Sequence, residues 1–302
     1  MKRRHGSFLA ASLLILAVSC ATKPKGPVTF DSGDFALLAP GGSVYCAVNV
    51  AASRLILDNL SLEGINGRDM AQVLDRTDSA VAAFYPPESG RSFMAAARGR
   101  YSFGTMFFSS ASGWKKQKSV NGGSYWYSAA RKISVSLKSR LAQISDRDPF
   151  LKAPGAEVPE GFALLTRNAA MAGWVNNAGE HLDRLFENLG IPLQIPAERL
   201  LFGIYAVSDE GAPGTGAPGY EAVVRLETPS AGHARGLVNL ISMVGALAAS
   251  AEGFPEAIAP FFAQRPQQDE AALIIRTGIM SEAQITLLFN LFSVNSSSHA
   301  DL

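Results

Sequence analysis

Cysteine is almost absent from this 302-residue chain, in which only Cys20 and Cys46 occur. Because Cys20 directly follows an export signal and is the expected modification site, no second thiol remains to form an intramolecular disulfide with Cys46. The chain of 47% hydrophobic residues must therefore be stabilised by its apolar core. It is long enough for one large domain or two smaller ones.

Residues with obvious chemistry are also scarce. After the export signal, histidine occurs only at positions 181, 233 and 299, at unrelated spacings and without an H-E-x-x-H motif or a cysteine cluster, so zinc is not expected. There is no G-x-S-x-G motif, and no pair of carboxylates stands out for acid–base catalysis. We therefore expect no enzymatic activity, no metal and no cofactor.

One glycine motif, Gly214–Gly219, matches G-x-G-x-x-G letter for letter. A dinucleotide site needs a strand before this motif and a helix after it, so that backbone N–H groups meet the pyrophosphate. Here a strand-like segment follows the motif, and Pro218 lacks an N–H donor. The motif is therefore interpreted as a loop between two strands.

The N-terminus resembles a bacterial lipoprotein signal peptide over residues 1–19. Three basic residues at positions 2–4 precede an apolar run, Phe8–Val18, that is too short for the roughly 20 residues of a membrane-spanning helix. The sequence then reads A-V-S-C, which resembles a lipobox with Ala17 where the pattern prefers leucine. It predicts an acyl chain such as palmitate on Cys20, and the alternative is ordinary cleavage after Ala21.

Removing residues 1–19 takes away three positive charges, so the formal net charge of +1 becomes 1 − 3 = −2. A chain with so little net charge lacks the basic footprint of a nucleic-acid-binding protein. Residues 20–32 are polar and contain proline, which is typical of a tether.

An internal repeat with an offset of about 127 residues follows the tether. Four short segments recur in the same order: Phe35–Leu38 as Phe162–Leu165, Val48–Asn49 as Val175–Asn176, Leu57–Leu60 as Phe186–Leu189, and Phe93–Arg98 as Tyr220–Arg225. The pattern predicts a duplication with halves at residues 33–147 and 155–294, packed as one body.

Periodicity predicts the order β-α-β-β-α-β in each half. In the second half we expect strands at 161–166, 200–207, 220–227 and 271–277, with helices around 182–189 and 237–250. A last helix begins at Ser281, whose spacing from Gln284 is that of a capping box. In the first half, strands are expected near 35–38, 79–85, 92–98 and 124–135. The fold class is α/β of the α+β type, with antiparallel-rich sheets covered by amphipathic helices.

The two copies differ in one segment of the second half. Arg98 and Ile133 are 35 residues apart, whereas Arg225 and Ile274 are 49 apart, and the extra length falls on residues 237–264. This segment begins LVNLISMVGALAAS, which carries no charge. Its fourteen residues would form a helix of about 21 Å, shorter than the roughly 30 Å hydrocarbon core of a bilayer. Either it is buried against the sheet, or it lies at a membrane interface with a small, uncharged polar face.

Further apolar residues follow in a proline-containing stretch and in the last helix, more than two modest sheets need to bury. We therefore predict a set of membrane- or lipid-contacting residues, which either insert into a bilayer or enclose an acyl chain. They are Leu237, Leu240, Ile241, Val244, Leu247, Phe254, Phe261, Phe262, Ile285, Leu288, Phe289 and Phe292.

The most basic stretch after the signal peptide is Gly113–Gly123, with Trp114 followed by Lys115, Lys116 and Lys118. Such a stretch is typical of a solvated hairpin tip. Alternatively, the lysines contact anionic headgroups and the tryptophan lies at the membrane interface.

The lipobox-like A-V-S-C, the duplicated α/β body and the uncharged amphipathic helices together resemble the concealed outer-membrane lipoproteins of treponemes. The resemblance implies lipidation of Cys20 and a location at the periplasmic leaflet of the outer membrane. It also implies insertion of the helices containing Leu240–Leu247 and Ile285–Phe292 into the bilayer, which they perturb or permeabilise. The expected partners are then membrane lipids, including a bound or transported fatty acid or phospholipid. The alternative is an envelope lipoprotein that acts as a scaffold or binds a protein partner and carries no lipid.

Overall fold

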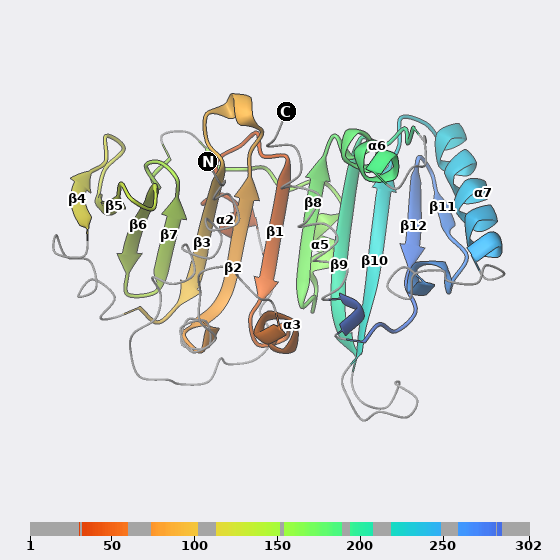
Figure 1. Cartoon of the computed structure of the whole chain (residues 1–302), viewed down its shortest axis with the longest axis horizontal. Helices are drawn as coiled ribbons and strands as arrows, with labels where there is room; N and C mark the ends of the chain where they lie inside the picture. Colours follow the sequence, from red (N-terminus) through yellow and green to blue (C-terminus); the bar gives the residue numbers. More distant parts are fainter. Residues whose placement is uncertain are drawn as a thin grey trace. The chain divides into compact units, whose positions relative to one another are not determined.

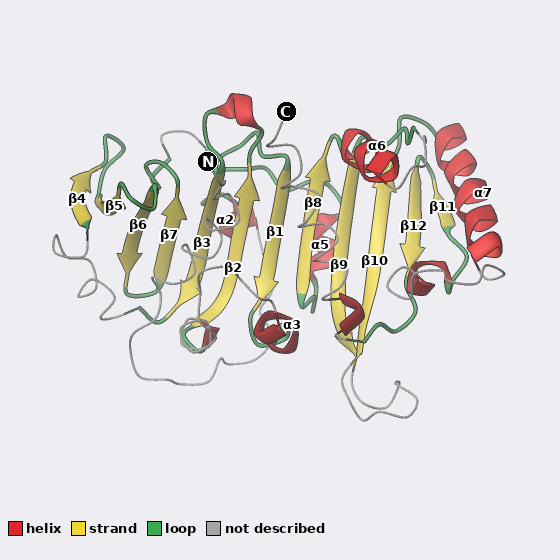
Figure 2. Cartoon of the chain, in the orientation of Figure 1, coloured by secondary structure: helices red, strands yellow, loops and turns green. Residues whose placement is uncertain are grey.

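The computed structural model of the chain describes residue 30 and residues 32–59, 74–101, 113–151, 154–188, 194–207, 219–248, 259–281 and 283–285. The chain divides into two compact units, Met1–Ala163 and Leu164–Leu302. Strands dominate the described part of each unit, and helices lie against them (Figure 1, Figure 2). The expected second half began at residue 155, whereas the second compact unit begins at Leu164.

The first unit is built on an antiparallel sheet in the order β1-β2-β3-β7-β6-β5-β4. Its strands are β1 (Val44–Asn49), β2 (Thr77–Phe84), β3 (Phe93–Gly99), β4 (Trp114–Lys118), β5 (Ser124–Ser128), β6 (Ile133–Lys138) and β7 (Leu141–Ser145). Its helical segments are α2 (Ser32–Phe35), α3 (Arg54–Asn59) and η2 (Pro87–Ser89), and α5 (Phe162–Thr166) begins at its end.

α2 lies on one face of this sheet, and its Phe35 contacts Phe162 at the start of α5. Burial alternates along β1 and β2, as expected for strands with one face in the core. The rings of Phe35 and Phe162, both buried, meet edge to face with centroids 5.4 Å apart. The Tyr45 and Tyr85 hydroxyls both donate to the Ala39 carbonyl, at 2.9 and 2.8 Å. These bonds fix the turn that leads from α2 into β1.

The opposite face carries a second apolar cluster toward the β4 end of the sheet. Its buried members come from β3, β4, β6 and β7 and include Phe93, Trp114, Ile133, Val135 and Ile144. Trp114 is only 5% exposed, and the Arg131 guanidinium lies 5.7 Å from its ring centroid. The last hairpin of the sheet is therefore fixed by a buried tryptophan.

The second unit has a sheet in the order β11-β12-β10-β9-β8, again antiparallel at every described pairing. Its strands are β8 (Met171–Asn176), β9 (Arg199–Val207), β10 (Gly219–Glu227), β11 (Gln267–Asp269) and β12 (Ala272–Arg276). The helices are α6 (Ala178–Asn188), α7 (Ala231–Ala248) and η5 (Ala259–Phe262).

α6 and α7 pack on the same face of this sheet. The register pairs Leu200 with Leu226 and Leu226 with Leu273, so these three side chains share one face. Leu182 of α6 and Leu237 of α7 join the same cluster. The apolar side of each helix therefore covers one stripe of leucines across three strands.

The α+β class with antiparallel-rich sheets is confirmed, and so are the strands expected at 79–85, 92–98, 200–207, 220–227 and 271–277. The strands expected at 35–38 and 161–166 are wrong, because both FALL segments lie at short helices, α2 and α5. The first strand of each half comes about ten residues later, as β1 and β8. The stretch 124–135 contains two strands, β5 and β6, separated by a turn. The order β-α-β-β-α-β of the second half survives with β8 in first place.

The pairing also corrects the alignment of the two halves. Arg225 pairs with Ile274 on β12, and its repeat counterpart Arg98 pairs with Leu141 on β7. These separations are 274 − 225 = 49 and 141 − 98 = 43 residues, so the second half is longer by six residues at this point rather than fourteen. The halves differ less in length than in content, since the first has the β4–β5 hairpin where the second has α7 and η5.

Candidate functional site

α7 begins six residues before the uncharged stretch that suggested a helix. Ser230 caps it, because its backbone carbonyl accepts from the Ala234 N–H at 3.1 Å and its Oγ accepts from the His233 N–H at 3.3 Å. The helix then runs eighteen residues to Ala248. After Arg235 it carries no charged residue.

The inner side of α7 packs against its own sheet. Leu237 is 4% exposed and belongs to the core cluster with Leu226 and Leu273. Leu240 and Ile241 are half-buried and pack against the same cluster. Three of the residues predicted to contact lipid therefore pack against the protein's own sheet in this structure.

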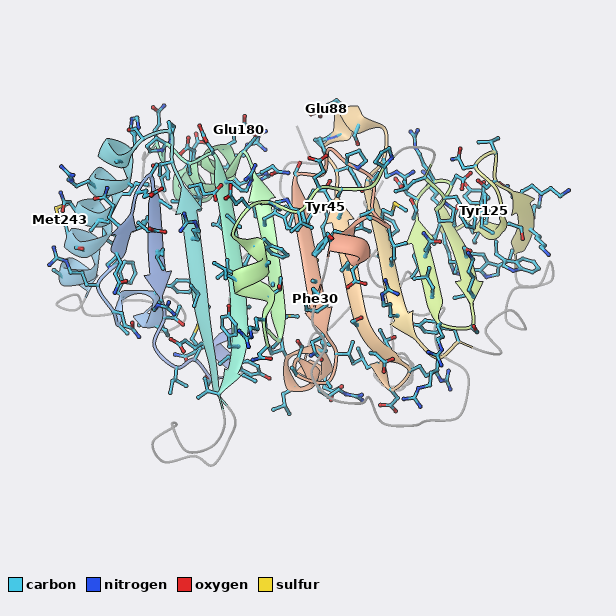
Figure 3. The ribbon with its side chains drawn as sticks, turned by 180° about the vertical axis from the view of Figure 1, so that it is seen from behind. Phe30, Tyr45, Glu88, Tyr125, Glu180 and Met243 are labelled. Atoms are coloured by element: carbon cyan, nitrogen blue, oxygen red, sulfur yellow. The ribbon has the colours of Figure 1, made fainter. Side chains whose placement is uncertain are left out.

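The outer side of α7 presents apolar groups to solvent. Met243 is 56% exposed and Val244 is 37% exposed. Figure 3 shows Met243 pointing away from the strands of its unit. The neighbouring exposed positions Gly236, Asn239 and Ala246 are small or uncharged. Leu247, the remaining predicted lipid contact on this helix, lies in its last turn.

η5 lies against the second half of α7. An added Cβ at Gly245 would come within 3.0 Å of the Phe262 ring, so this ring approaches the helix backbone closely. Phe261 and Phe262 are both half-buried. A pocket of about 330 Å³ opens between the two elements, lined by Ile241, Ser242, Gly245, Ala246, Phe262, Gln264, Arg265 and Pro266. The Ser242 hydroxyl is buried there and makes no hydrogen bond to the described residues.

The capping box predicted at Ser281 is formed. The Gln284 side-chain oxygen accepts from the Ser281 N–H at 2.8 Å, and the Ser281 hydroxyl accepts from the Gln284 N–H at 3.3 Å. Ile285, a predicted lipid contact, is 1% exposed and is packed in the protein. The other predicted contacts of this region and the predicted acylation site lie outside the described residues: Cys20, Phe254, Leu288, Phe289 and Phe292.

The basic stretch forms the β4–β5 hairpin, as the hairpin interpretation expects. Lys115, Lys116 and Lys118 are exposed. Trp114 is packed in the core cluster of the first unit, so it does not face an interface as the headgroup interpretation required. Trp114 is the only apolar residue of β4, so its indole is the side chain through which this strand packs against the apolar cluster.

Five exposed large apolar residues of the described chain were not singled out from the sequence: Leu55, Val120, Leu164, Met243 and Ile279. Val120 is 96% exposed at the tip of the β4–β5 hairpin, and Met243 is 56% exposed on α7. The turn sequence S-V-N-G-G predicts a tip and so an exposed valine. Met243 carried no signal of its own, because the helix is apolar on more than half its surface.

Burial is the main cause of the pKa shifts of Cys46 and Tyr125. Burial raises the pKa of the Cys46 thiol to about 11. Partial burial and the nearby Asp148 carboxylate and Tyr127 raise the pKa of Tyr125, whose hydroxyl donates to the Gln117 side-chain oxygen at 2.8 Å. Among the described residues, no group of three or more His, Cys, Asp or Glu side chains is placed to hold a metal ion. None of the described helices is both long and apolar enough to span a membrane.

Comparison with known proteins identifies related chains. Residues 31–143 match the family described as outer membrane-associated lipoprotein TP0453. The crystal form III structure of TP0453 is 19% identical over 86% of this chain and 98% of that one, with a TM-score of 0.59. Crystal form I is 17% identical over 87% and 99% of the two chains, with a TM-score of 0.58. Comparison with curated protein sequences finds no match.

The structural matches have low sequence identity and establish a common fold, while the family match connects the first half of the chain with outer membrane-associated lipoproteins. Together they confirm the resemblance to the treponemal outer-membrane lipoproteins that the sequence indicated.

Proposed function

We propose that this protein is a lipid-anchored, non-enzymatic protein of the outer membrane, in which α7 enters the bilayer and perturbs or permeabilises it. The C-terminal helix that begins after Ser281 is proposed to act with α7. Lipidation of Cys20 holds the protein at the periplasmic leaflet, and membrane lipids are its partners. The role includes binding or transport of lipid.

The observation that carries this proposal is the two-sided apolar character of α7. Its inner side packs on the sheet through Leu237, yet its outer side exposes Met243 and Val244 without a charge after Arg235. A helix that merely closes a core normally has a charged outer face. An uncharged outer face lowers the cost of burial in lipid on that side as well.

The anchor and the helix support each other physically. A single acyl chain binds a bilayer only marginally and reversibly, so firm attachment needs a second apolar element. α7 supplies such an element through side chains that are already exposed. Deeper insertion would transfer Leu240 and Ile241 from the half-buried edge of the core cluster to the lipid.

The pocket beside α7 favours a second, compatible function, the binding of one acyl chain. Its lining is apolar along Ile241, Gly245 and Phe262, with Arg265 as a cationic group that could pair with a carboxylate or phosphate. At about 330 Å³ it is at the small end of ligand pockets. Lipid extraction of the purified protein followed by mass spectrometry tests this function, which predicts one bound lipid for each chain.

The main proposal is tested with residues 21–302, so that the acyl chain does not dominate binding. Flotation with phosphatidylcholine vesicles and release of an enclosed dye are compared between the native chain and the double variant Met243→Glu, Val244→Glu. Both side chains are exposed, so the variant should fold. We expect it to lose vesicle binding by about tenfold or more and to release little dye.

The matched control is Ala231→Glu with Gln267→Glu, which adds the same two charges at exposed positions of the same unit. Ala231 is the first residue of α7, where a carboxylate suits the helix N-terminus and lies far from the outer apolar side. This control should bind and permeabilise as the native chain does. Equal behaviour of the native chain and the Met243, Val244 variant would rule out insertion by α7. Dependence on one protein partner, with no affinity for vesicles, would instead support the scaffold alternative.

A further inference from the structure

The first unit carries an uneven distribution of charge. Residues 89–145 contain no Asp or Glu but ten Lys and Arg residues, although the whole chain is close to neutral. Arg98 pairs with Asp34, and Arg91 donates to the Ser145 hydroxyl and the Asp148 carbonyl. The cations of β4 have no such use, since none of the ion pairs among the described residues includes Lys115, Lys116 or Lys118.

β4 is the last of the described strands in the first unit's sheet, so its lysines lie along the outer edge of that described sheet. Its register with β5 pairs Lys116 with Trp126 and Lys118 with Ser124, which puts these two lysines on one face. Lys115 pairs with Tyr127 on the other face. We call these three lysines together with Val120 the lysine edge.

The tip of the lysine edge is held in position. The Ser119 hydroxyl donates to the Asp148 carboxylate at 2.6 Å and accepts from the Asn121 N–H at 2.9 Å. The Asn121 amide donates to the Phe150 carbonyl at 2.9 Å. Gly123 has a φ of +88°, and an added Cβ there would come within 2.8 Å of the Phe150 ring. These contacts fix a turn whose only large apolar side chain, Val120, points into solvent.

Asp148 is the carboxylate nearest the tip, and it is already used by the protein. It accepts from the Ser119 hydroxyl and, at 3.0 Å, from the Phe150 N–H. Besides burial, its negative charge also raises the pKa of Tyr125. Tyr125 shares a face of the hairpin with Lys115 and Gln117, and Lys116 and Lys118 lie on the other face. The face with Lys116 and Lys118 therefore has no carboxylate among the described residues of β4 to β7.

We propose that the lysine edge is a docking surface for an anionic phospholipid bilayer, separate from α7. This inference rests on the proposed function only in that the protein must meet a bilayer. Lys115, Lys116 and Lys118 contact lipid phosphates, and Val120 enters the headgroup layer at the fixed tip. A bilayer fits better than an acidic protein or a polysaccharide because an exposed apolar tip flanked by lysines matches an apolar layer beneath a charged one.

The test compares binding of residues 21–302 to pure phosphatidylcholine vesicles and to vesicles with about one third phosphatidylglycerol. The variant Lys115→Gln, Lys116→Gln, Lys118→Gln removes the three charges from exposed positions. Each lysine near an anionic surface is worth about a fivefold change in binding, so the triple variant should bind the anionic vesicles about a hundredfold more weakly. Its binding to phosphatidylcholine should be unchanged. Added salt should weaken the binding of the native chain to anionic vesicles and should have almost no effect on the binding of the variant.

The matched control is Arg167→Gln, Arg184→Gln, Arg276→Gln, which removes three exposed charges from the second unit. It should keep its preference for anionic vesicles. The proposal would be overturned if the control lost as much binding to anionic vesicles as the lysine variant, or if the lysine variant lost none. Binding to soluble polyglutamate is measured in parallel, and a lysine variant that loses only this binding would also overturn the proposal. The two proposals fail in different measurements. If α7 does not insert, the native chain releases no dye from phosphatidylcholine vesicles; if only the lysine edge is wrong, this dye release remains.

Discussion

The two halves of the chain share one plan and then diverge after their third strand. In both, a short helix, a strand, a helix and two antiparallel strands follow in order, with β1 and β8 offset by 127 residues. The first half then has the basic β4–β5 hairpin, and the second half has helix α7, which carries no charged residue after Arg235. The two halves therefore share an order of elements, and they differ in surface chemistry at equivalent places, where one has the hairpin and the other has α7.

The insertions are attached in different ways. The hairpin is fixed by one buried indole and by hydrogen bonds from its tip, and its lysines remain outside. α7 is attached by leucine and isoleucine side chains that pack against the sheet. The hairpin is therefore held by one indole and by hydrogen bonds, whereas α7 packs on the sheet through apolar side chains.

Trp114→Ala should have the largest effect, because Trp114 is the only buried side chain of β4. Truncating a buried tryptophan costs about 3–5 kcal/mol. Urea unfolding should show this loss, and hydrogen exchange should show lost protection in β4 to β6 while β8 to β12 remain protected. A cost below about 1 kcal/mol would mean that the hairpin is fixed by something else.

Leu237→Ala should come next, with a cost of about 2–5 kcal/mol for a buried leucine. Hydrogen exchange should increase in α7 and β12 and remain unchanged in the first unit. Met243→Ala is the matched control on the same helix and should change the free energy of unfolding by less than about 0.5 kcal/mol. Equal costs at the two positions would contradict the inner and outer sides assigned to α7.

A smaller difference in stability is expected between the ion pairs of Arg98 and Arg225, which are counterparts in the two halves. Arg98 pairs with Asp34, whose side chain is only 10% exposed, whereas Arg225 pairs with Asp269, which is 50% exposed. Asp34→Asn should therefore cost about 1–3 kcal/mol, since a hydrogen bond to a largely buried charged group is lost. Asp269→Asn should cost less than about 1 kcal/mol. Thermal unfolding of the two variants under the same conditions measures both, and the reverse order would contradict this comparison.

Val120→Ser should have the smallest effect on stability, below about 0.5 kcal/mol, because this side chain is 96% exposed. Circular dichroism melting curves should coincide with those of the native chain. A clear loss of stability would show that Val120 is covered in solution and does not form an exposed tip.

Much of the fold could be predicted from local pattern. The alternating apolar residues of β2, β3, β9, β10 and β12 and the capping box at Ser281 were readable, because each reflects a short-range rule. The FALL segments were misread as strands because a short apolar run does not distinguish a strand from one buried turn of helix. β1 and β8 were missed because their small, mixed residues lack a strong period.

The candidate surfaces were only partly predictable. The uncharged character of α7 and the lysines of β4 are properties of composition, so the sequence was sufficient to find them. The side that each residue faces is a tertiary property: Trp114 turned inward, Leu237 was already covered by the sheet, and Val120 and Met243 turned outward. No local rule decides between these orientations when a helix or hairpin is apolar on more than one side.

In the proposed function, α7 enters lipid through its outer side. The decisive measurement is the depth of a fluorophore attached to Met243→Cys in residues 21–302 with Cys46→Ala, read with lipids that carry quenchers at known depths. We expect quenching from the hydrocarbon layer at position 243, headgroup-level quenching for Val120→Cys in the same background, and none for Glu180→Cys on α6. If position 243 of the vesicle-bound protein is quenched no more than position 180, α7 does not enter the bilayer and the account is wrong.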